Sequence, residues 1–281
     1  MGRGMMRAGA FAALLLAVPA AAAPARVMSL NLCADQLVLA LVPPERIVSV
    51  SYLARDCRNS VACAAAARTP INYGSAEELV AAQPDLIVAG RYTTRSTVAV
   101  ARHFGFPVLD LDVPSTIEGV RAQIIEVASA VDRPEQGAAM VAALDRDLAS
   151  LPPPAPRAHR PVAAVYEPRG FTVGKGSLID TLLDRAGFDN LAVERGIGND
   201  PVLPLEELIW AQPDLLIIEG RERERPSLGT ALLDHPILKS GFPSDRQVTI
   251  PQKLWLCGGP SIAEALRLLT QARERIEAGP S

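Results

Sequence analysis

Histidine, aromatic residues and the common catalytic motifs are scarce in this sequence. Among its 281 residues there are three histidines, and phenylalanine, tryptophan and tyrosine together make up 4%. The sequence has no H-E-x-x-H, no G-x-S-x-G and no C-x-x-C, which removes the usual signals of several enzyme classes. His103 ends a predicted helix, His159 lies in a Pro-rich stretch and His235 lies in an Asp-His-Pro turn. Neither a Ser-His-Asp triad nor a histidine cluster for a bare metal ion is therefore well supported.

A complete phosphate-binding loop is also missing. The segment from Gly174 to Ser177 reads Gly-Lys-Gly-Ser, but position 169 is Arg where such a loop has Gly. Gly176 also follows Lys175 where Ser or Thr is required. We therefore expect no nucleotide hydrolysis by this chain and, with the other motifs absent, no enzyme activity.

Long hydrophobic runs are rare, and the one that stands out lies at the N-terminus. Arg3 and Arg7 precede an apolar run over residues 8–18, and small residues follow over 20–25. This order is typical of a secretory signal peptide, because the apolar run is too short to span a bilayer. We expect cleavage between Ala22 and Ala25 and a periplasmic mature protein. A retained membrane anchor is the alternative.

The sequence has no excess of positive charge. Removal of Arg3 and Arg7 from the 28 basic residues leaves 26 against 31 acidic ones, a net charge near −5. A nucleic-acid-binding protein normally has a basic face, so this balance argues against a nucleic-acid partner.

One stretch occurs twice. Ten residues from Glu77 to Leu86 recur from Glu206 to Leu215 with eight identical positions. Each copy is typical of a helix end, a Pro-Asp turn and a buried parallel strand, because Pro stops a helix and apolar residues fill such a strand. In the first copy, Ser75 and Glu78 have the spacing of a capping box. A repeated helix-turn-strand unit predicts two similarly built lobes.

Strand and helix patterns alternate around both copies, which predicts an α/β fold of two Rossmann-like lobes with central parallel sheets. From Ser115, which forms a predicted capping box with Glu118, more than thirty residues carry helical patterns and no strand. We expect this part to be a long rigid interlobe helix. The predicted divisions are a signal peptide over 1–23, an N-terminal lobe over 24–114, an interlobe helical connector over 115–160 and a C-terminal lobe over 161–281.

Four cysteines in an exported chain can pair. Cys57 and Cys63 are close together in a polar loop and could close a small ring. Cys33 and Cys257 fall in loops of opposite lobes. They could be free soft ligands, a bridge between the lobes or buried free thiols, and geometry decides whether a bridge is possible.

Ligands of parallel α/β lobes bind outside the carboxyl ends of the strands, so two facing lobes would form a cleft there. The loops at these ends supply aromatic rings and arginines, which suit a flat or bulky ligand with negative charge. The candidate ligand-binding residues are Asn31, Cys33, Tyr52, Arg91, Tyr92, Arg169, Phe171, Arg221, Trp255 and Cys257.

The two-lobed order resembles the substrate-binding proteins of ATP-binding-cassette importers for iron–siderophores, haem and cobalamin. The segment from Phe171 to Ser177 is similar to the one that opens the second lobe in that family, and the segment from Ala82 to Ala89 resembles its first-lobe signature. The resemblance covers roughly residues 26–276. Cobalamin binders resemble this chain at Tyr52, but they carry Trp where Gly90 stands and Arg where Cys257 stands, which argues against cobalamin.

The resemblance implies a permease dimer of an ABC importer as partner and a small-molecule metal chelate as cargo. Iron or cobalt would belong to the carried ligand, and no resident cofactor or metal is expected. In the family, an acid at the start of each repeat helix docks on permease arginines, and the matching positions are Glu77 and Glu206, with Glu78 and Glu207 beside them. Two alternatives remain, a periplasmic enzyme that uses the same cleft and a carrier of bare Zn or Mn.

Overall fold

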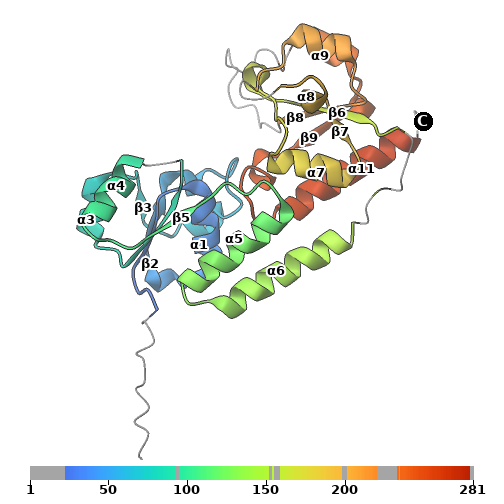
Figure 1. Cartoon of the computed structure of the whole chain (residues 1–281). Helices are drawn as coiled ribbons and strands as arrows, with labels where there is room; N and C mark the ends of the chain where they lie inside the picture. The colour runs from blue at the N-terminus through green and yellow to red at the C-terminus, as the bar shows by residue number, and fades with distance from the viewer. Residues whose placement is uncertain are drawn as a thin grey trace, which may run out of the picture.

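Two separate parallel sheets form the centres of two lobes (Figure 1). The computed structural model describes residues 23–92, 95–151, 154, 159–197, 201–219, 233 and 235–278. In the first lobe the strand order is β3-β2-β1-β4-β5, and in the second it is β7-β6-β8-β9. The first-lobe strands are β1 (Val27–Ser29), β2 (Ile47–Ser51), β3 (Ile71–Asn72), β4 (Leu86–Gly90) and β5 (Val108–Leu111). The second-lobe strands are β6 (Val162–Tyr166), β7 (Asp189–Asn190), β8 (Leu215–Glu219) and β9 (Gln247–Ile250).

Every strand pair in both sheets is parallel. Parallel sheets are covered on both faces. Accordingly, β1 is buried along its length, and residues 86–89 of β4 are both buried and apolar. The predicted α/β class with two parallel sheets is confirmed.

Helices cover the faces of both sheets. In the first lobe they are α1 (Leu32–Leu41), α2 (Cys63–Ala66), α3 (Ala76–Ala82) and α4 (Arg95–His103). In the second lobe they are α7 (Leu178–Ala186), α8 (Leu191–Glu194), α9 (Leu205–Ala211), α10 (Pro236–Gly241) and α11 (Ile262–Ala278). Within the described ranges, no helix combines the length and apolar character needed to cross a bilayer.

The repeated stretch builds the same local structure in both lobes. Its helices are α3 and α9, and each ends at a glutamine in the left-handed conformation, Gln83 with φ 45° and Gln212 with φ 47°. Both glutamine side chains donate 2.8 Å hydrogen bonds to a carbonyl of the preceding turn. Left-handed residues commonly end helices, and here the amide side chain bonds back to its own helix.

The aspartate of each repeat ties the turn to the first strand of its lobe. Asp85 accepts hydrogen bonds from the backbone N–H groups of Ala25 and Arg26, just before β1. Asp214 accepts one from the N–H of Val162 at the start of β6. A carboxylate that accepts from backbone N–H groups forms a charge-assisted bond, so the repeat fixes the register of each sheet.

The connector consists of two helices, α5 (Ile117–Ala130) and α6 (Pro134–Ala149), which pack side by side (Figure 1). A short turn at residues 131–133 reverses the chain, and α6 makes the crossing to the second lobe. Gly137 permits close packing, because a Cβ there would lie 2.3 Å from the Cβ of Ala128. The predicted capping box of Ser115 and Glu118 is wrong, because Thr116 caps α5 by accepting from the N–H of Gly119, while Glu118 pairs with Arg121.

The largest hydrophobic core runs through both lobes. It includes Val27 and Val88 of the first sheet, Leu144 of α6, and Val165 and Leu266 from the second lobe. Smaller clusters fill the outer side of each lobe. Since one apolar core continues across the junction, the lobes are joined by packing as well as by the chain.

Candidate functional site

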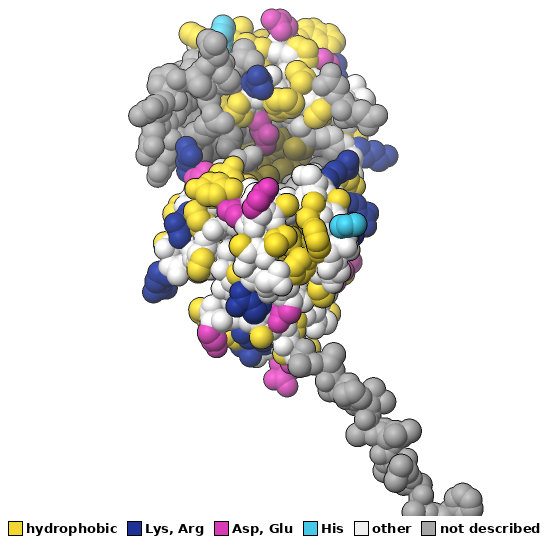
Figure 2. All heavy atoms as spheres, turned by 90° about the vertical axis from the view of Figure 1, so that its left-hand side faces the viewer, with side chains coloured by type: hydrophobic (Ala, Val, Ile, Leu, Met, Phe, Trp, Pro, Cys, Tyr) yellow, Lys and Arg dark blue, Asp and Glu magenta, His cyan; other side chains and the backbone are white. Residues whose placement is uncertain are grey.

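A cavity of about 450 Å³ lies between the lobes, and the space-filling view shows the molecule hollowed there (Figure 2). Its first-lobe lining comes from the carboxyl ends of β1, β4 and β5, and its second-lobe lining from the start of α7 and the loop after β9. The lining residues are Asn31, Cys33, Gly90, Arg91, Tyr92, Leu111, Asp112, Val113, Pro114, Ser115, Gln123, Gly176, Ser177, Leu178, Ile179, Trp255, Leu256 and Gly258.

The first-lobe part of the cavity lies at a topological switch point. The chain leaves β1 toward β2 on one side and returns to β4 on the other, so the loops after β1 and β4 diverge. Asn31 follows β1 and caps α1 by accepting from the N–H groups of Cys33 and Ala34 at 2.9 and 3.2 Å. Arg91 follows β4. The position of the cavity matches the general rule for ligand sites in open α/β sheets.

The charged groups of the cavity form one ion pair. Arg91 Nη1 lies 2.7 Å from Asp112 Oδ1, and both side chains are about half exposed. Such a pair adds little to stability in water. It does hold the guanidinium at the mouth of the cavity, where a ligand anion would compete with Asp112 for it.

The second-lobe wall of the cavity includes the N-terminus of α7, which is capped by Ser177. Ser177 Oγ accepts from the N–H of Asp180 at 3.0 Å and donates to the carbonyl of Gly174. The N–H of Gly176 donates to Asp180 Oδ2 at 3.0 Å. These bonds occupy the N–H groups of Gly176 and Asp180 and the hydroxyl of Ser177.

The aromatic residues predicted to bind ligand lie in different environments. Tyr92 is exposed at the cavity, whereas Trp255 lines it but is only 4% exposed and belongs to the central core. Tyr52 lies outside the cavity and stacks on Tyr73, with ring centroids 5.1 Å apart. The two tyrosine rings are 48% and 69% exposed, so they form a flat surface at the ends of β2 and β3.

The structure brings together only part of the predicted set. Asn31, Cys33, Arg91, Tyr92 and Trp255 line the cavity, and Cys257 is bonded to Cys33. Arg221 lies outside the described residues.

The expectation that Tyr52, Arg169 and Phe171 would converge with them on one cavity is not met, because none of the three lines it. Tyr52 follows β2, across β1 from β4 and β5, and Arg169 and Phe171 follow β6, whereas the second-lobe wall comes from α7 and the loop after β9.

Sequence reasoning missed Tyr73, Asp112 and Gln123. Tyr73 follows β3, whose two residues are too few for a strand pattern. Asp112 directly follows β5, and that position was the available signal for it. Gln123 lies inside α5 and donates to the carbonyl of Asp112 at 2.7 Å, a contact that helical periodicity does not predict.

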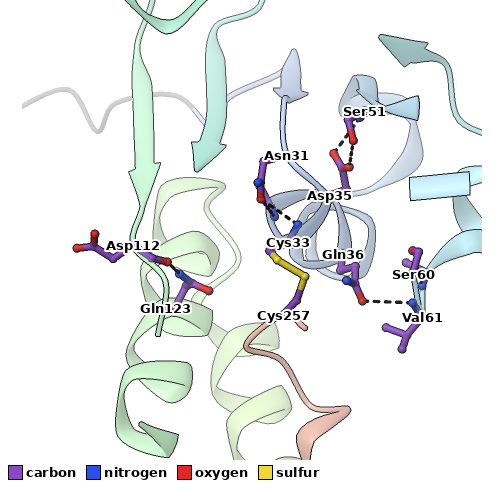
Figure 3. The surroundings of a disulfide bond; sticks show 12 residues. Asn31, Cys33, Asp35, Gln36, Ser51, Ser60, Val61, Asp112, Gln123 and Cys257 are labelled. Carbon is purple, nitrogen blue, oxygen red and sulfur yellow. Dashed lines mark hydrogen bonds between the residues drawn. A yellow bond between two sulfur atoms is a disulfide. The ribbon is translucent and has the colours of Figure 1, made fainter. Parts of the chain in front are cut away.

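A disulfide joins the lobes beside the cavity (Figure 3). Cys33 at the start of α1 is bonded to Cys257 in the loop after β9, with the Cα atoms 5.1 Å apart and a sequence separation of 224. These two cysteines were expected to be free soft ligands, a bridge between the lobes or buried free thiols, and the structure shows that they form the bridge. Cys57 and Cys63 form the small ring.

The loop next to Cys257 approaches the first lobe very closely. A Cβ on Gly258 would lie 2.2 Å from Pro114 Cγ and 3.0 Å from Val120 Cγ2, so any other residue would force the loop or Pro114 to shift. The Thr181 hydroxyl of α7 also donates to the carbonyl of Ser115 at 2.7 Å. The disulfide, the close approach of Gly258 to Pro114 and the hydrogen bond from Thr181 therefore all join the second lobe to the first on one side of the cavity.

Asp35, two residues after Cys33, is a fully buried carboxyl group. Its oxygens accept from the N–H of Ser51 at 3.0 Å and from the Ser51 hydroxyl (Figure 3). Burial raises the pKa of Asp35 from 3.8 to about 6, because desolvation of the charged form outweighs these hydrogen bonds. The described residues contain no group of three or more His, Cys, Asp or Glu side chains that could hold a metal ion.

Comparison with known proteins identifies the family. A model described as "Periplasmic binding protein" matches residues 27–241. The chain belongs to the periplasmic binding protein family. Two curated relatives, both named cobalamin-binding protein and from two strains of Halobacterium salinarum, are 24% identical over 209 residues. The match covers 72% of this chain and 55% of theirs, so this binding protein spans about half their length.

Solved structures have the same fold. The periplasmic haem-binding protein RhuT from Roseiflexus sp. RS-1 is 24% identical, with a TM-score of 0.72, covering 89% of this chain and 98% of that one. The periplasmic haem-binding protein HutB of Vibrio cholerae is 20% identical, with a TM-score of 0.69 and coverages of 88% and 98%. The vitamin B12-binding protein BtuF of Vibrio cholerae is 16% identical, with a TM-score of 0.65 and coverages of 90% and 98%. The family and these neighbours are binding proteins and not enzymes.

Replacement of Asp35 by Asn should remove a pH dependence of stability. Because the pKa is raised in the folded state, Asp35 stabilises the fold below about pH 4, and this contribution is lost as the pH rises through about 6. The free energy of unfolding of the parent, measured relative to that of Asp35→Asn, should be about 2 kcal/mol higher at pH 4 than at pH 7.5. Urea unfolding at both pH values measures this, and a constant difference would contradict it.

Removal of the interlobe bridge should cost more stability than removal of the small ring. In the chain-entropy model, a loop closed by cysteines 224 residues apart is worth about 5 kcal/mol and one closed by cysteines six apart about 2 kcal/mol. Urea unfolding should therefore give a larger loss for Cys33→Ser with Cys257→Ser than for the control, Cys57→Ser with Cys63→Ser. Equal losses would argue that core packing alone holds the lobes together.

Proposed function

We propose that this chain is a periplasmic solute-binding protein that captures a metal chelate between its lobes and delivers it to the permease of an ABC importer. The observation that carries the proposal is the cavity of about 450 Å³ at the switch point, lined from both lobes in a chain of the periplasmic binding protein family. Cavities of 300–1,000 Å³ are typical ligand sites. The three histidines are exposed and none lines the cavity, which disfavours an enzyme that would use one of them as a general base.

The lining favours a largely apolar ligand with a small number of anionic or acceptor groups. Arg91 supplies the cationic group, and Tyr92, Leu178 and Leu256 supply apolar surface. The stacked pair of Tyr52 and Tyr73 offers a second flat surface at the same edge of the first sheet. Ferric siderophores, haem and corrinoids fit this description, with iron or cobalt as part of the cargo. Arg169, Phe171 and Arg221 remain predictions as ligand contacts.

Capture would proceed with little lobe motion. The disulfide from Cys33 to Cys257 and the contact of Gly258 with Pro114 fix one end of the interlobe space. Entry and release would therefore use the opposite, open side, and closure would involve the loops more than the lobes. ATP would be hydrolysed by partner subunits, in keeping with the incomplete phosphate loop.

The duplicated acids suit docking on a two-fold permease. Glu78 is occupied in the capping box with Ser75, and Glu207 lies 3.9 Å from Arg195. Glu77 and Glu206, one residue earlier in each helix, are exposed. Each repeat helix thus uses its second acid within the lobe and leaves its first acid available to a partner, so we propose Glu77 and Glu206 as the permease contacts.

Ligand binding should be detectable by tryptophan fluorescence. Trp255 lines the cavity, so haem, ferric siderophores and corrinoids should be tested for quenching of its emission. Arg91→Ala should weaken binding of the responding ligand about 10-fold or more, because a hydrogen bond to a charged group is lost. Arg58→Ala is the matched control, an arginine that is also paired with an aspartate, Asp56, but lies away from the cavity. No response to any ligand would count against the cavity as the site.

Docking should depend on the exposed acids of the repeats. Glu77→Arg with Glu206→Arg should abolish uptake of the ligand in cells while leaving its affinity in solution unchanged. The control is Glu135→Arg with Glu274→Arg, which makes the same change in charge at exposed positions of α6 and α11. An equal loss of ligand affinity in the repeat variant would assign the acids to the cavity or to folding instead.

A further inference from the structure

The exposed face of α9 carries a large aromatic side chain that nothing in the fold requires. Trp210 is 77% exposed, the highest fraction among the large apolar side chains of the described residues. It follows Glu206 by four positions, so both side chains lie on one face of the helix. An indole left in water gives up most of the stabilisation that its burial would provide, so its exposure points to a partner that covers it.

The indole is held in place before any partner arrives. Arg195, which caps the end of α8, has its Cζ atom 5.0 Å from the centroid of the Trp210 ring. Its Nε lies 3.9 Å from Glu207 Oε1 on α9. The chain of Glu207, Arg195 and Trp210 restricts the ring by a cation–π contact and an ion pair. A side chain that is already ordered loses less entropy on binding, which is a property of strong interface anchors.

The equivalent face of the first lobe lacks the aromatic residue. Position 81 of α3 corresponds to position 210 of α9, and Ala81 is exposed there. The two repeat helices therefore present the same acid, Glu77 or Glu206, but only α9 adds an indole. Both helices lie far from α5 and α6, at the outer sides of their lobes (Figure 1). The duplicated surface is thus symmetric in charge and asymmetric in apolar character.

We infer that Trp210 is the apolar anchor of the second-lobe docking surface. It inserts into an apolar recess of the permease, beside the basic group that pairs with Glu206, and it gives the complex one preferred orientation. This inference rests on the proposed function. Tryptophan is among the residues most enriched at the energetic centres of protein interfaces, and an adjacent charge pair supplies orientation.

The test measures binding of the ligand-loaded protein to its cognate permease–ATPase complex in lipid nanodiscs. Trp210→Ala should raise the Kd for the nanodisc at least about 30-fold, the loss typical of an interface anchor. Phe104→Ala, which removes another exposed aromatic ring in the first lobe, should change it less than twofold. Ligand affinity should be unchanged in both variants.

Iodide quenching gives a second readout. In the free protein, iodide should quench Trp210 and not Trp255, because the two rings are 77% and 4% exposed. Addition of the nanodisc should protect the quenched component. Unchanged affinity of Trp210→Ala, or continued quenching in the complex, would overturn the inference.

The charge-reversed pair Glu77→Arg with Glu206→Arg separates this inference from the proposed function. If this variant loses binding to the nanodisc while Trp210→Ala retains it, docking through Glu77 and Glu206 is supported and the role of Trp210 as an anchor is refuted. If the parent protein does not bind the nanodisc, the proposed delivery to a permease fails, and the inference fails with it.

Discussion

The arrangement of the two lobes depends on the junction where the second lobe meets the first. The disulfide between Cys33 and Cys257 ties the start of α1 to the loop after β9, and the absence of a side chain at Gly258 lets that loop lie against Pro114. The central core continues through the same region, with Trp255 packed into it. Since the cavity is lined by these same segments, its shape is set by contacts that also hold the lobes together.

The duplicated stretch determines much of what the lobes share. Each copy ends its helix at a left-handed glutamine, and its aspartate ties the turn to the first strand of the lobe. An arginine in each lobe, Arg26 or Arg246, then donates to carbonyls at the end of the repeat helix. The two arginines come from different places in the chain, since Arg26 directly precedes β1 and Arg246 lies in the turn before β9. The two lobes therefore form similar bonds with residues that are not equivalent in sequence.

The sequence predicted the lobes well because their signals are local. Apolar runs, Pro-Asp turns and the Ser75–Glu78 capping box each follow from neighbouring residues, and the structure contains all of them. The site was harder, because it depends on which strands lie side by side. Tyr52 and Arg91 both follow strands of one sheet, yet only Arg91 lines the cavity between the lobes. The pairing of Cys33 with Cys257 and of Arg91 with Asp112 likewise required the tertiary arrangement.

The connectivity of the interlobe disulfide constrains how the chain acquires its covalent structure. The bond encloses residues 33–257 in a covalent ring, with β1 outside it at one end and α11 at the other. In a chain that emerges from its N-terminus, Cys33 precedes its native partner by 224 residues, whereas Cys57 and Cys63 lie within thirty. Four cysteines allow three pairings. Oxidation in order of appearance would join Cys33 to Cys57. The native pairing therefore requires either that Cys33 stay reduced until Cys257 is available or that an early disulfide be exchanged for the native one.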